Sequence, residues 1–183
     1  MSDDRPRPWW KRGRPALTPP PDAFDASLRL PALLAPGGVA VWTEPVDRQA
    51  VVAALAPRVA DAAGLDEALV LRLLQKRDAL GSTHLGEGVD LPHARVDGLE
   101  WPAFALGLTR GGVADAEAPT EVVWLLLLPP GAAGLGTTAQ VARACHDADF
   151  RHALRTAGGT ADVRAALARW ERAHEAPPAA WGS

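Results

Sequence analysis

VVWLLLL, at residues 122–128, is the stretch of sequence that decides the fold. Every residue in it is apolar, so a strand at this place is hydrophobic on both faces. Strands of that kind lie in the middle of a sheet that helices cover on both sides. Pro129, Pro130 and Gly131 follow directly and end the strand. The stretch therefore predicts the central strand of a layered α/β domain.

Strands and helices alternate outward from this stretch. VAVWT at 39–43 is rich in residues that favour strands, and AFALGLT at 103–109 places its large side chains on one face. The spacing of apolar residues predicts a helix over 47–62, ended by Gly64, and Asp66 caps the next one. The final helix begins near Thr160. Its predicted apolar stripe consists of Val163, Ala166, Leu167 and Trp170.

The composition fits a single domain and indicates which classes of protein the chain does not belong to. The chain has 183 residues, of which 48% are hydrophobic, and this suits a single domain with a sizeable core. A net charge of −3 and a pI near 5.9 argue against a protein that binds nucleic acid through bulk charge. Cys145 is the one cysteine, so no internal disulfide forms, which fits a reducing compartment. We expect Cys145 in the core.

The two ends of the chain read differently from its middle. Residues 1–26 are rich in proline and arginine and form an N-terminal extension, either a flexible tail or one that docks Trp9 and Trp10. Residues 173–183 form a C-terminal tail. No apolar run approaches the roughly 20 residues that cross a membrane, and no apolar segment follows the basic N-terminus as in a secretory signal. We therefore expect a cytoplasmic protein without stable membrane insertion.

KRDALGSTHLGEGVDLPHAR, at residues 76–95, is the stretch that carries chemistry. Its three glycines predict tight turns and close backbone approach. His93 follows a proline that restricts the backbone, and Arg77 and Arg95 lie on either side of it in sequence. A neutral imidazole is a competent nucleophile near pH 7, and backbone N–H groups and arginine stabilise a transferring phosphoryl group. These parts suit phosphoryl chemistry without a metal, although a lone histidine is more often structural.

The same stretch resembles the phosphorylation site of the enzyme IIA domains of the bacterial phosphotransferase system, in the fructose/mannitol and nitrogen-regulatory class (type 2). The resemblance extends over about 27–172 and includes a short helix before the first strand. It implies a three-layer α/β/α sandwich with a mixed central sheet. The positions that match the family motif are Arg77, Gly81, Ser82, Thr83, Gly86, Gly88, Pro92, His93 and Arg95.

The resemblance also implies a function. His93 would accept a phosphoryl group from an HPr-type phosphocarrier protein and pass it to a IIB partner, with Arg77 pairing the phosphoryl oxygens and with no cofactor. An alternative is a nitrogen-regulatory or degenerate module that acts by binding proteins. Both alternatives stay open on the sequence.

Three positions depart from the family pattern. Gly134 stands where the family often has a second histidine. His84 replaces a usual glycine, and it either takes over part of the lost histidine's place or is an exposed loop residue. Asp90 replaces a small residue, and it either orients an imidazole or repels phosphate. Ser82, Thr83 and Arg95 complete the expected neighbours of the site.

The remaining candidates receive plainer interpretations. His146, His152 and His174 lie among charged residues on the terminal helices and are expected to be solvated, with no zinc pattern among them. GAAGLGTT at 131–138 has the spacing of a P-loop, but threonine stands at the lysine position. We expect that stretch to be a strand-to-helix connection.

Overall fold

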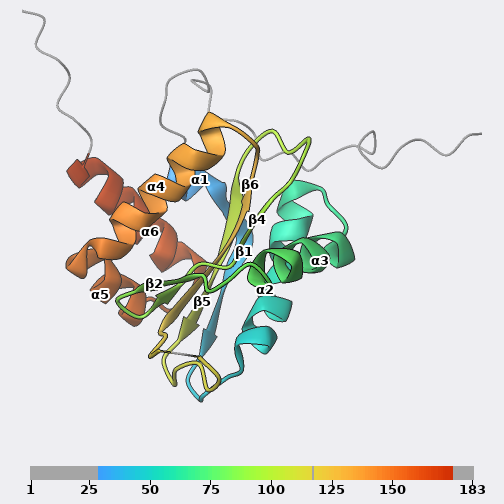
Figure 1. Ribbon diagram of the computed structural model, residues 1–183. Coiled ribbons are helices and arrows are strands. Elements are labelled where there is room, and N and C mark those ends of the chain that lie inside the picture. The colour runs from blue at the N-terminus through green and yellow to red at the C-terminus, as the bar shows by residue number, and fades with distance from the viewer. Residues whose placement is uncertain (1–28, 117, 175–183) are drawn as a thin grey trace, which may run out of the picture.

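The computed structural model describes residues 29–116 and 118–174, and these form one mixed sheet with helices on both faces (Figure 1). The sheet has six strands in the order β1-β5-β6-β3-β2, with β4 also paired to β6. The strands are β1 (Leu34–Trp42), β2 (His84–Gly86), β3 (Val89–Asp90), β4 (His93–Arg95), β5 (Ala103–Thr109) and β6 (Val122–Leu128). The helices are α1 (Leu30–Leu33), α2 (Arg48–Ala63), α3 (Glu67–Asp78), α4 (Ala132–His146), α5 (Ala148–Thr156) and α6 (Thr160–His174).

The strand β6 lies at the centre, as the apolar stretch predicted. It runs antiparallel to β5 and parallel to both β3 and β4. Its side chains alternate between two cores: Trp124 and Leu126 join the core beneath α4, α5 and α6, while Leu125 and Leu127 join the core beneath α2 and α3. Figure 1 shows the resulting three layers, with these two groups of helices on opposite sides of the sheet. The three-layer α/β/α fold with a mixed sheet is therefore confirmed.

Several helices begin or end at the residues that the sequence indicated. Gly64 ends α2 in the left-handed conformation, at a φ of 65°. The Asp66 side chain accepts a hydrogen bond from the Leu69 N–H and caps α3. The last helix starts at Thr160 and buries the stripe that its sequence predicted. Cys145 is buried on α4, also as predicted.

Two segments differ from the sequence prediction. The strand β1 begins at Leu34, five residues before the expected start at Val39, because Leu34 pairs with Phe104 across an irregularity that includes Gly37. The stretch 131–138 is not a connection, because α4 begins at Ala132 and those residues form its first turns. The predicted N-terminal extension, with Trp9 and Trp10, lies outside the described residues.

Candidate functional site

The segment between α3 and β4 brings the chemical motif together. The helix α3 ends at Asp78, β2 and β3 form a short antiparallel hairpin, and Pro92 then leads into β4. Gly81 opens this segment with a φ of 132°, a conformation that residues with a Cβ rarely adopt. His93 is the first residue of β4 and pairs with Leu126 of the central strand. The histidine is therefore carried on a strand that pairs with the fully buried β6 rather than on a free loop.

Both ring nitrogens of His93 have partners. Nδ1 lies 2.8 Å from the carbonyl oxygen of Leu91, and a carbonyl only accepts, so Nδ1 carries the proton. The neutral ring therefore keeps its lone pair on Nε2. Arg77 approaches that nitrogen, and its Nε–H donates to Nε2 across 3.1 Å. The half-buried imidazole is thus fixed in one tautomer, with the lone pair of Nε2 directed at a guanidinium.

Arg77 is itself held by the loop that follows its helix. One terminal nitrogen donates to the carbonyl oxygen of Gly81 at 3.1 Å, while Nε contacts His93. The guanidinium therefore lies between the start of the glycine-containing loop and the imidazole. A planar cation with several N–H donors at this place suits a phosphoryl group on Nε2.

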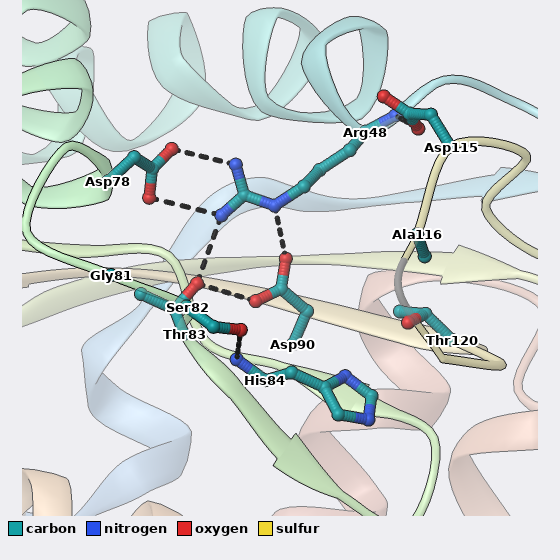
Figure 2. Close-up of a pocket in the computed structure, with 10 residues that line it drawn as sticks. All are labelled: Arg48, Asp78, Gly81, Ser82, Thr83, His84, Asp90, Asp115, Ala116 and Thr120. Carbon is teal, nitrogen blue, oxygen red and sulfur yellow. Dashed lines mark hydrogen bonds and ion pairs between the residues drawn. The ribbon is translucent and has the colours of Figure 1, made fainter.

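A second arginine, Arg48, forms hydrogen bonds with three side chains of this segment. Arg48, the first residue of α2, donates from Nε to Asp90 at 2.6 Å, and from its terminal nitrogens to Asp78 at 2.7 and 3.2 Å and to Thr83 at 3.0 Å. The Thr83 hydroxyl donates to the other oxygen of Asp90 at 2.6 Å. We call these four residues the Arg48 network. Figure 2 shows them among the residues that line a cavity of about 350 Å³.

Burial and the neighbouring negative charges have opposite effects on the pKa of Arg48. Burial lowers the pKa of the Arg48 guanidinium, but the hydrogen bonds and negative charges of Asp78 and Asp90 more than offset it, so the pKa is raised above its ordinary value. Asp90 is only 5% exposed. A carboxylate this deeply buried needs a cation and hydrogen-bond donors, and Arg48 and Thr83 supply them.

The matched family bears directly on this geometry. A family model described as the phosphoenolpyruvate-dependent sugar phosphotransferase system, EIIA 2, matches residues 37–170, which include the whole segment from Arg48 to His93. The chain belongs to this EIIA family.

Two similar proteins are nitrogen regulatory proteins. The nitrogen regulatory protein of Bradyrhizobium diazoefficiens is 30% identical over 142 residues, which cover 74% of this chain and 92% of that protein. The crystal structure of the nitrogen regulatory protein IIA-Ntr from Neisseria meningitidis superposes with a TM-score of 0.65 at 28% identity and covers 75% of this chain and 97% of that one.

A more distant structure shows the same fold. Enzyme IIAMtl of Escherichia coli, solved in complex with phosphorylated enzyme IIBMtl, has a TM-score of 0.60 at 14% identity and covers 75% of this chain and 99% of that one. At this identity the likeness shows the fold alone. No helix in the described part of this EIIA domain has the length and apolar character to cross a membrane.

The expected neighbours of His93 in the EIIA domain occupy different places. Ser82 is exposed, and its hydroxyl accepts from the His84 N–H at 3.2 Å. The His84 imidazole is half-buried, points away from Arg48 in Figure 2, and forms no side-chain hydrogen bond within the described residues. Arg95 ends β4 exposed, without a side-chain partner in that same part of the chain. The idea that His84 takes over the second histidine's place stays a prediction, and no hydrogen bond joins it to His93.

The structure adds detail at Asp90 and Gly134. The carboxylate of Asp90 accepts hydrogen bonds from Arg48 and Thr83, and no hydrogen bond joins it to an imidazole within the described residues. Gly134 lies buried in the first turns of α4, where a Cβ would come within 2.3 Å of the Pro129 carbonyl oxygen. The position where the resemblance led us to expect a second histidine therefore has no room for a side chain on this backbone.

The exposed histidines of the terminal helices follow the sequence interpretation in the main. His146 and His152 are exposed. His174 is exposed as well, but its ring stacks on Trp170 at a centroid distance of 4.8 Å and its Nδ1 lies 2.9 Å from the Trp170 carbonyl oxygen.

Sequence reasoning missed Arg48 and Asp78. Arg48 lies outside the stretch 76–95 and precedes it by nearly thirty residues, whereas Asp78 lies inside that stretch but was not singled out. One signal was available: an aspartate inside an otherwise apolar short strand requires a cation nearby. The N-terminus of the preceding helix was one place to look for it.

Proposed function

We propose that this EIIA domain is a phosphocarrier that accepts a phosphoryl group on Nε2 of His93 from an HPr-type protein. The observation that carries the proposal is the pair of contacts on the imidazole. Leu91 holds the proton on Nδ1, which leaves the lone pair on Nε2, and Arg77 contacts that same nitrogen. A nucleophile in one tautomer beside a fixed cation is what transfer of a phosphoryl group between histidines requires.

The proposed step balances without an external base. The Nε2 lone pair attacks the phosphorus of the phosphorylated donor, the new N–P bond forms, and the bond between phosphorus and the donor's nitrogen breaks. The proton on Nδ1 stays on the Leu91 carbonyl side, so no proton has to leave the nucleophilic nitrogen. Arg77 leaves Nε2 as the phosphorus approaches, which frees the lone pair, and its N–H donors then bind the phosphoryl oxygens and stabilise the transferring charge. No cofactor takes part.

The phosphorylated domain could act in one of two ways. Transfer to a IIB partner is supported by the E. coli IIAMtl fold neighbour, which was solved with phosphorylated IIBMtl. A regulatory role, in which phosphorylation changes what the domain binds, is supported by the names of the two relatives at 28% and 30% identity. We favour the regulatory role, because the mannitol domain is only 14% identical.

Intact mass spectrometry tests the carrier role. The protein is incubated with phosphoenolpyruvate, enzyme I and an HPr-type protein, and we expect a gain of one phosphoryl group that is labile in acid. His93→Ala abolishes the gain. His152→Ala, which removes an exposed histidine of α5, is the matched control and keeps it. No gain with several HPr-type donors would reject the carrier role and favour a degenerate binding module.

Two additions make the test specific to the geometry. Nitrogen and phosphorus NMR of the phosphorylated protein should place the group on Nε2 rather than on Nδ1. Arg77→Gln should lower the rate of phosphorylation on the order of 10²-fold, which is typical for removal of one donor that stabilises developing charge. Phosphorylation on Nδ1 would contradict the tautomer that Leu91 imposes.

A further inference from the structure

The two partners of the His93 ring come from two separate segments of the chain. Arg77, which contacts Nε2, belongs to the last turn of α3, and Leu91, which contacts Nδ1, follows β3. These segments are joined by a loop and a hairpin. A change in the distance between them would move one partner relative to the other and would release the ring.

The Arg48 network connects these two segments directly. Asp78 is the neighbour of Arg77 at the end of α3, and Asp90 is the neighbour of Leu91 at the end of β3. One guanidinium bonds to both aspartates, with Asp78 bound through two nitrogens. The Thr83 hydroxyl closes a ring of hydrogen bonds with Arg48 and Asp90.

Backbone contacts extend this connection to the ring itself. The N–H of Leu91 donates to the carbonyl oxygen of Thr83 at 3.0 Å, while the carbonyl of Leu91 accepts from His93. The Thr83 side chain is bound within the Arg48 network, so the same short loop holds Leu91 and is held by Arg48. Arg77 in turn donates to Gly81, two residues before Thr83.

We infer that the Arg48 network is a positioning device that holds Arg77 and the Leu91 carbonyl on the two nitrogens of His93. It thereby fixes the tautomer and the direction of the nucleophile, without touching the imidazole. Its members are positioning residues, because their contacts reach the ring only through Arg77 and Leu91. The inference rests on the proposed phosphocarrier function for its consequence on rate, but its structural part does not.

The chemistry of Arg48 makes the network sensitive to conservative changes. Four N–H bonds leave the planar guanidinium toward three different side chains. A lysine ammonium at this place keeps the positive charge but lacks the planar set of donors that reaches Asp78 and Asp90 together. Arg48→Lys therefore tests whether the positive charge alone is enough or whether the hydrogen bonds of the guanidinium are needed.

Thr83 offers a gentler test within the same network. Thr83→Val keeps the side-chain shape and removes the hydroxyl, whereas Thr83→Ser keeps the hydroxyl. Thr109→Val is the matched control, since Thr109 is also buried and its hydroxyl donates to the Thr120 carbonyl at 3.0 Å, with no bond to the Arg48 network. Both valine variants lose one buried hydroxyl and its hydrogen bonding.

The experiment combines two readouts on folded protein. Ring-nitrogen NMR of the unphosphorylated full chain reports the tautomer of His93. Single-turnover kinetics with a phosphorylated HPr-type donor separate the rate constant at saturation from the donor concentration that gives half the maximal rate. We expect Arg48→Lys and Thr83→Val to mix the tautomers and to lower the saturated rate constant about 10- to 100-fold, the range set by small misplacements of reacting groups.

The control variants complete the expectation. Thr83→Ser restores the single tautomer and most of the rate, and Thr109→Val leaves both at the wild-type level. Unchanged ring signals and rates in folded Arg48→Lys and Thr83→Val would overturn the inference, and the network would then only stabilise the fold. If Arg48→Lys fails to fold, the comparison of Thr83→Val with Thr83→Ser tests the inference. If wild-type His93 takes no phosphoryl group, the proposed function fails, while the ring signals still decide on positioning.

Discussion

Cys145 shows how strongly one residue responds to its surroundings. The thiol lies on the buried face of α4, and burial raises its pKa from 9.0 to about 12, although the positive charge of Arg151 opposes the shift. The thiolate is the reactive form of cysteine. Cys145 should therefore be inert at neutral pH and has no part in the phosphoryl chemistry that we propose for His93.

The raised pKa predicts a loss of stability at alkaline pH. Above pH 9 the unfolded chain releases the thiol proton while the folded chain retains it, so the free energy of unfolding falls as pH rises toward 12. Between pH 8 and pH 10 the expected loss from this one group is about 1.4 kcal/mol. Urea unfolding at the two pH values measures it, and Cys145→Ala should remove that part of the pH dependence. An equal pH dependence in both proteins would refute the assignment.

At the residue scale, the sequence predicted the chemical centre better than its support. The spacing of the motif singled out His93 and Arg77, and the structure brings the two within 3.1 Å. That contact is local, since the end of one helix and one hairpin separate the pair. The partner of Asp90 could not be read in the same way, because Arg48 reaches it only through the packing of α2 against the sheet.

At the scale of elements, the start of α4 is packed tightly against the end of β6. Gly134 is buried there, and a Cβ would meet the Pro129 carbonyl oxygen at 2.3 Å, whereas Gly136 in the same helix has open space around it. Because backbone rather than a flexible side chain is the obstacle, the helix itself would have to shift. The two glycines therefore have opposite roles in one helix.

Substitution of these glycines should give effects of opposite sign. Gly134→Ala and Gly134→His force the helix away from Pro129, and we expect a loss of about 1–3 kcal/mol in the free energy of unfolding, as for an overpacked core. Gly136→Ala, the matched control, should gain about 0.5–1 kcal/mol from helix propensity. Urea unfolding measures all three. A Gly134→His protein as stable as wild type would show that the family's second histidine fits this backbone after all.

Element boundaries were predictable where a local signal exists and not elsewhere. Both long central strands, at 103–109 and 122–128, have the bounds that their sequence predicted, because runs of apolar residues end at turn formers. The early start of β1 had no such signal, since alanine, proline and two glycines disfavour a strand and only the pairing with Phe104 holds them. The glycines of 131–138 hid the start of α4 for a similar reason.

At the scale of the whole molecule, β6 makes the three layers one cooperative unit. Leu125 and Leu126 are neighbours on this strand and are both fully buried, yet they pack into the two different cores on either side of the sheet. The apolar run thus predicted the layered fold as well as one strand, because only a sheet covered on both faces buries every residue of the run. The loss of either core exposes the same strand.

Cooperativity can be tested by damaging each core separately. Leu125→Ala and Leu126→Ala should each lower the free energy of unfolding by about 2–5 kcal/mol, the range for a buried leucine replaced by alanine. Leu135→Ala, at a leucine of α4 that is 62% exposed, should change it by less than about 0.5 kcal/mol. Because both cores share β6, each variant should unfold in a single transition that coincides by circular dichroism and by tryptophan fluorescence. Separate transitions in either variant would mean that one helical layer unfolds while the other remains, and that the imidazole on β4 can be released without loss of the whole fold.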